Sequence, residues 1–107
     1  MRTYDTKKAE TMARDGKRTE VMHQASHFKI RMIELPLGGS IPPCEMASSV
    51  IFHVMSGTVD ITSDGETVTI MEGQGVVSEP ATVSMMSTTG ARLLGIQIEN
   101  PQGERNE

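Results

Sequence analysis

The feature that most constrains the fold is a period-two alternation of apolar and polar residues, which recurs in short runs from Thr19 onward. The run 58–63, TVDITS, shows it most clearly. Successive side chains of a β-strand point to opposite faces, so this period is typical of strands and does not suit a helix. Asp64-Gly65 follows the run, and both residues tolerate positive φ, which predicts a two-residue hairpin turn. We therefore expect 58–63 to pair with 67–71.

The other runs have the same character and are bounded by Gly, Pro, Ser and Asp. They cover residues 19–24, 27–35, 50–55, 76–78, 83–87 and 92–98. Many short strands with almost no helical pattern predict an all-β sandwich or closed barrel, which leaves few exposed strand edges. We expect residues 1–18 to form a polar arm or short helix on the surface, 19–99 to form the barrel, and 100–107 to form a frayed tail.

Length and charge limit the functions that are open to the chain. Its 107 residues suffice for one domain with one core. The net charge is −4 and the Lys and Arg residues are scattered, which disfavours a nucleic-acid partner, because phosphate binding needs a concentrated basic surface. We find no apolar stretch of membrane-spanning length and no signal core at the N-terminus, so we expect a cytoplasmic protein without a membrane partner. The lone Cys44 cannot form an internal disulfide, which agrees with a reducing compartment.

Two stretches of the chain resemble a known family. They read LPLGGSIPPCEM (35–46) and VIFHVMSGTVDITSDGETVTIMEGQGVVSEPATVSM (50–85). Their turn residues are spaced as in small single-domain cupins of the cupin 2 conserved barrel family, and the matching positions are Gly38, Gly57, Gly65, Gly73 and Pro80. The resemblance implies a small antiparallel β-barrel, also called a jelly roll or double-stranded β-helix. It also implies a homodimer formed through barrel faces and strand exchange, for which the run 19–24 is our candidate interface strand.

The metal-binding positions depart from the pattern of that family. Its two motifs supply a His-x-His pair, a Glu and a third His. Counting from the matched glycine and proline, these positions carry Cys44, Met46, Val50 and Met85 here. Manganese, nickel and ferrous iron prefer imidazole and carboxylate ligands, so such a metal is disfavoured. The missing carboxylate also removes the obvious general base, and no other acid–base pair has a convincing spacing.

Strand alternation and the barrel comparison together predict one set of inward side chains, with His53 pointing outward. The set is Met32, Cys44, Met46, Val50, Phe52, Val54 and Met85. Cys44, Met46 and Met85 could form a soft sulfur site for monovalent copper or another soft metal. Alternatively, the set lines an apolar pocket without a cofactor, because Met often fills gaps and free Cys is often a small buried hydrophobe. We favour the pocket.

These observations predict a protein that binds a small molecule inside the barrel, with sensing or binding favoured over catalysis. The alternative is a cupin enzyme, of isomerase, lyase or oxygenase type, with an atypical soft-metal or metal-free site. A structural module that uses the barrel to dimerise is a third class. Cys44 acting as a nucleophile would require a stabilised thiolate, and no cation adjoins it in the sequence. Cupins host many chemistries on one scaffold, so the fold leaves the ligand open.

Overall fold

The structure is a computed structural model that describes residues 1–7, 12–14 and 17–99. Within these ranges the chain forms nine strands and no helix, and the paired strands are antiparallel. The strands are β1 (Met12–Arg14), β2 (Lys17–Gln24), β3 (Phe28–Leu35), β4 (Gly39–Met46), β5 (Ser49–Ser63), β6 (Glu66–Met71), β7 (Gly75–Ser78), β8 (Ala81–Ser87) and β9 (Ala91–Ile98). Among the described residues, then, no helix has the length and apolar character needed to cross a bilayer. The all-β prediction is confirmed, while the predicted tail 100–107 lies outside the described residues.

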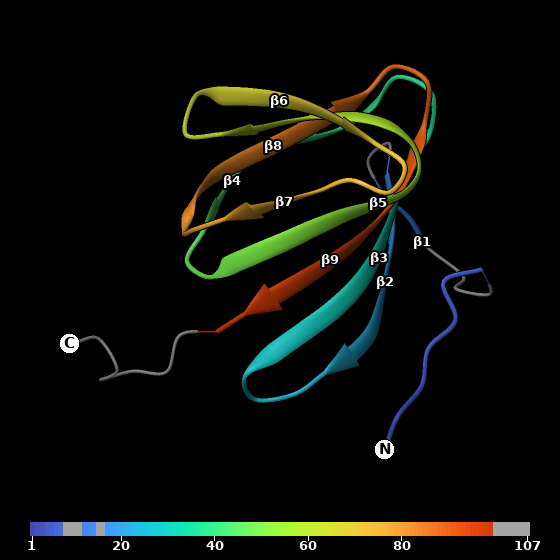
Figure 1. Ribbon diagram of the computed structural model, residues 1–107, viewed down its shortest axis with the longest axis vertical. Coiled ribbons are helices and arrows are strands. Elements are labelled where there is room, and N and C mark those ends of the chain that lie inside the picture. The colour runs from blue at the N-terminus through green and yellow to red at the C-terminus, as the bar shows by residue number, and fades with distance from the viewer. Residues whose placement is uncertain (8–11, 15–16, 100–107) are drawn as a thin grey trace.

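Two sheets pack against each other and share the long strand β5 (Figure 1). In the first sheet, β1-β2-β3-β9-β5 lie in that order and β7 pairs with β5 on its other side. In the second sheet, β4-β8-β5 lie in order and β6 pairs with β5. The first part of β5 therefore belongs to one sheet and the last part to the other. This arrangement is the small antiparallel jelly-roll barrel predicted from the sequence.

Strand β5 crosses between the sheets at Gly57, whose φ is +85°. A Cβ built on this residue would lie 2.1 Å from the carbonyl oxygen of Gly90, so the strand passes close to the backbone of the β8–β9 turn. Glycine alone combines this φ with this contact at no steric cost. The sequence pattern predicted separate strands at 50–55 and 58–63, and the structure joins them into one because the bend at Gly57 does not interrupt the ladder.

The hairpin at Asp64-Gly65 is confirmed. Ser63 pairs with Glu66, and the two turn residues have φ values of +48° and +88°. In addition, the Asp64 carboxylate accepts a hydrogen bond of 2.8 Å from the backbone N–H of Thr82. The turn is therefore stabilised both by its own backbone geometry and by a hydrogen bond to the start of β8.

Strand β4 lies at the edge of the second sheet. The sequence pattern did not predict it, because it showed a break at 36–40 and no separate strand pattern after it. Its pairing with β8 shifts between Ile41 and Cys44, where Pro42 and Pro43 form a β-bulge. Proline cannot donate a ladder hydrogen bond, and an edge strand with a bulge is where a sheet tolerates it. The prolines thus interrupt the alternation without ending the strand.

The core fills the space between the two sheets. It is aliphatic apart from Phe52 and Met85, and its buried members are Ile33, Leu35, Val50, Phe52, Val54, Val59, Ile61, Ile70, Val83, Met85, Ala91 and Leu93. The predicted arm at 1–18 differs from the structure, because β1 and the start of β2 extend the first sheet into it. Before β1, Arg92 Nη1 donates a 2.9 Å hydrogen bond to the carbonyl of Thr6, which ties that segment to β9.

Candidate ligand-binding site

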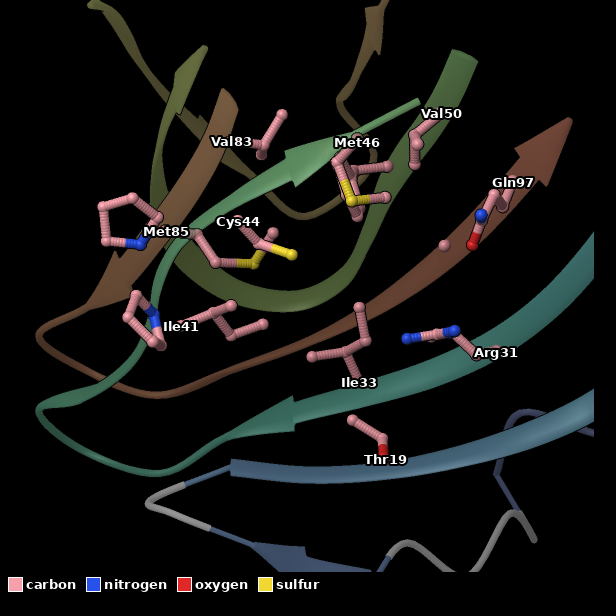
Figure 2. Close-up of a pocket in the computed structure, with 14 residues that line it drawn as sticks. Thr19, Arg31, Ile33, Ile41, Cys44, Met46, Val50, Val83, Met85 and Gln97 are labelled. Atoms are coloured by element: carbon pink, nitrogen blue, oxygen red, sulfur yellow. The ribbon is translucent and has the colours of Figure 1, made fainter. Parts of the chain in front are cut away.

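A cavity of about 310 Å³ lies between the two sheets. The first sheet supplies one side of it, from β2, β3, β5 and β9, and the second sheet supplies the other, from β4 and β8 (Figure 2). The lining residues are Thr19, Arg31, Ile33, Ile41, Pro42, Pro43, Cys44, Met46, Val50, Phe52, Val83, Met85, Gly95 and Gln97. Most of this surface is apolar, and its polar groups are concentrated on the side of the first sheet.

The bulge in β4 determines which side chains of that strand enter the cavity. Ile41 pairs with Met85 and Cys44 pairs with Val83, so three residue steps on β4 oppose two on β8. Because facing residues in a ladder share a side of the sheet, the extra residue keeps Ile41 and Cys44 both inward despite their odd separation. Met46 follows Cys44 by two positions and also faces inward (Figure 2).

Cys44, Met46 and Met85, which we call the sulfur wall, line this one cavity together. Met85 is buried at 4% exposure, whereas Cys44 is exposed. Val50 and Phe52 of the predicted set also line the cavity, from β5. The structure therefore brings the four positions that carry metal ligands in the resembled family to one space, where sulfur and aliphatic carbon replace imidazole and carboxylate.

Met32 and Val54, assigned to the cavity from the sequence, do not line it. Val54 is fully buried and belongs to the core between the sheets, beyond the cavity lining. Met32 lies on the opposite face of β3, since its neighbours Arg31 and Ile33 both face the cavity. It is fully buried there and pairs with Leu94 of β9. Alternation on β3 pointed to the wrong face, because Phe28, Ile30 and Met32 form the more apolar row, while Lys29 and Arg31 share the inner row with Ile33.

Sequence reasoning missed three polar side chains, Thr19, Arg31 and Gln97, which we call the polar wall. Figure 2 shows the Arg31 guanidinium extending from β3 into the space between the sheets. Gln97 Nε2 donates weak hydrogen bonds of 3.4 Å to Ser48 Oγ and to Glu99 Oε2. Arg31 lies two positions before Ile33 and therefore shares its face of β3. Once Ile33 was known to face inward, strand alternation alone would have identified Arg31.

Other titratable residues lie away from the cavity. His53 is exposed and points outward, as predicted, and the ring of His23 packs against Phe28 with a centroid distance of 5.5 Å. Glu79 accepts a hydrogen bond of 3.4 Å from Ser49 Oγ outside the cavity lining. In the described part of the chain, no three His, Cys, Asp or Glu side chains come together as a metal site. With Val50 at the position of the carboxylate, the residues present do not fit a hard divalent metal.

The fold and the cavity define a small cupin-fold protein. No family model and no curated protein matches the sequence, but solved structures match the fold over most of the chain. The cupin domain of Cnp3 from Schizosaccharomyces pombe is 13% identical with a TM-score of 0.83, and the match covers 92% of this chain and 74% of that one. An RmlC-like cupin from Shewanella frigidimarina is 14% identical with a TM-score of 0.81, covering 92% and 91% of the two chains. Salicylate 1,2-dioxygenase from Pseudoaminobacter salicylatoxidans is 15% identical with a TM-score of 0.75, covering 86% of this chain and 27% of that one.

Proposed function

We propose that the protein binds a small molecule of mixed polarity in the cavity between its two sheets, and that binding or sensing is its role. The observation that carries this proposal is the cavity itself, at about 310 Å³ with a predominantly apolar lining. This volume lies at the lower end of the range of small-molecule sites, which are concave, mostly apolar and equipped with a few polar groups. Catalysis is disfavoured because no carboxylate or imidazole lines the cavity within the described part of the chain.

A binding experiment with a cavity-filling variant tests this proposal. The probe is 3-phenylpropan-1-ol, a neutral molecule with an apolar body, and binding is followed by protein NMR shifts at the methyl groups of the lining. Val83→Phe fills the cavity from β8, and Met86→Phe is its matched control, because Met86 is 48% exposed and lies on the outer side of the same strand. We expect the shifts to saturate in the wild type and in Met86→Phe but to vanish in Val83→Phe, with circular dichroism checking that all three are folded. Shifts that spread over the surface, or that persist unchanged in Val83→Phe, contradict the proposal.

A second candidate is an enzyme with a soft-metal site, which the sulfur wall and the fold shared with a dioxygenase favour. A thiolate with two thioethers suits monovalent copper. Metal analysis of protein purified anaerobically distinguishes this candidate from the first. Stoichiometric copper that is lost in Cys44→Ser would favour the enzyme or metal-binding alternative, and an empty wild-type protein would exclude it. Met71→Leu is the control, because it removes an exposed thioether that lies outside the cavity. It should leave the copper content unchanged.

We also propose that two copies of the chain pair through the outer face of the first sheet. That face carries one continuous row of apolar residues across four paired strands, in the order Ile30, Ile96, Ile51 and Val77. Val77 is 69% exposed, and Phe28 and Ile98 extend the apolar surface at 36% and 38% exposure. A contiguous apolar surface of this kind marks an interaction site. Strand exchange through β2 is not favoured, because β1 pairs with the edge of β2 within the same chain.

A further inference from the structure

The cavity contains one charged group, and its placement is specific. Among the described residues that line the cavity, Arg31 is the single charged side chain. It pairs across the ladder with Gly95, and a Cβ built on Gly95 would lie 3.6 Å from Arg31 Cγ and 3.5 Å from Phe52 Cε1. The aliphatic stem of Arg31 therefore lies directly beside the bare backbone of Gly95 and next to an aromatic ring. This packing holds the stem while the guanidinium extends into the cavity (Figure 2).

The guanidinium of Arg31 is unpaired among the side chains that the structure describes. Across residues 1–7 and 19–99, whose side chains the structure describes, it makes no hydrogen bond or ion pair, and the described cavity lining contains no acidic side chain. Arg31 is nevertheless partly buried. A partly buried cation beside apolar walls loses some of its hydration, and proteins normally compensate for this loss with a pairing anion. An anionic ligand in the cavity would compensate for this loss.

The cavity as a whole is amphipathic. The polar wall, with Arg31 and Gln97, belongs to the first sheet, and the sulfur wall lies across from it (Figure 2). Gln97 donates through Nε2, and its Oε1 accepts no hydrogen bond within the described residues, so it is open to a donor on a ligand. The volume of about 310 Å³ equals that of about ten water molecules at about 30 Å³ each. A ring or short chain with one head group fits this space.

We infer that the ligand is a small monocarboxylic acid, whose carboxylate pairs with Arg31 and whose apolar body lies against the sulfur wall. The planar guanidinium fork matches the two oxygens of a carboxylate, and such charge-assisted pairs are stronger than neutral hydrogen bonds. A single cation balances a single negative charge, whereas a phosphate ester of higher charge would leave one charge unpaired in an apolar space. This inference rests on the proposed binding function and adds the chemical class of the ligand.

Isothermal titration calorimetry with matched probes tests the inference. The probes are 3-phenylpropanoate and its neutral isostere 3-phenylpropanamide, with acetate as a head group that lacks an apolar body. We expect the dissociation constant of the acid to be at least about tenfold lower than that of the amide. A hydrogen bond between charged groups is strong enough to produce a difference of this size. Acetate should bind more weakly than the acid. In Arg31→Met the affinity for the acid should fall to that of the amide, while the affinity for the amide changes by less than about threefold.

Arg92→Met is the matched control, since Arg92 lies on the outer face of the neighbouring strand and outside the cavity lining. It removes the same charge from the protein and should leave the preference for the acid intact. Equal affinities for acid and amide, or an acid preference that survives in Arg31→Met, overturn the carboxylate inference while leaving the binding function standing. If the acid fails to bind and 3-phenylpropan-1-ol binds at the cavity, the inference alone is wrong. If neither binds, both the inference and the proposed function fail.

Discussion

Replacing Gly57 by alanine should destabilise the fold more than the same change at Gly73, although both glycines have a φ of +85°. At Gly73 a Cβ meets no atom within 4 Å, so the cost there is only the strained backbone, about 1–2 kcal/mol. At Gly57 the Cβ would lie 2.1 Å from the carbonyl oxygen of Gly90 and 2.8 Å from Ala91 Cα. Both are backbone atoms, so β5 must move away from the β8–β9 turn, which adds about 1–3 kcal/mol of overpacking.

The assay is urea denaturation followed by far-ultraviolet circular dichroism, since the chain has no Trp to report on unfolding. We expect Gly57→Ala to lose about 2–5 kcal/mol in total, against about 1–2 for Gly73→Ala. For a domain of this size each kcal/mol corresponds to a fall of about 4–8 °C in melting temperature, so the two variants should be well separated. Failure of Gly57→Ala to fold while Gly73→Ala folds agrees with the reasoning. Equal losses in the two variants would refute it, because the contact with Gly90 would then contribute nothing.

Three further measurements address the turn, the thiol and the outer face. Asp64→Ala loses the hydrogen bond to Thr82 and places Ala at a φ of +48°. Urea denaturation should therefore show that the free energy of unfolding falls by about 1–3 kcal/mol. A fall below about 0.5 kcal/mol would contradict the turn geometry. Cys44 is exposed, so iodoacetamide should label it in the native protein at about the rate of free cysteine; labelling only after unfolding would place the thiol in a closed site. Val77→Lys should convert a dimer to a monomer in size-exclusion chromatography with light scattering, whereas Leu37→Lys, at a separate exposed position, should not. An unchanged mass for Val77→Lys would move the interface away from this face.

Local chemistry makes parts of this fold predictable from the sequence. The hairpin at Asp64-Gly65 depends on the two turn residues and on the alternation beside them, and both are visible in the chain. The continuity of β5 is different, because it depends on a close approach between Gly57 and a turn more than thirty residues away. In the same way, the pattern predicted a break at 36–40 and no separate run for β4, and Pro42 and Pro43 fit into this strand because it lies at a sheet edge.

The chemistry of the cavity depends on a choice that alternation leaves open. On β5 the inner face is plain, because Val50 and Phe52 alternate with a residue as polar as His53. On β3 each face mixes apolar and charged residues, since Lys29 and Arg31 lie on one and Glu34 on the other, so either could turn inward. The structure turns Arg31 and Ile33 inward, with Arg31 opposite Gly95 of the partner strand β9. If β3 were turned over, Met32 would face the cavity and Arg31 would not. The described lining of the cavity would then contain no cation. The face of β3 that turns inward therefore decides whether the cavity lining includes the guanidinium on which the proposed carboxylate binding depends.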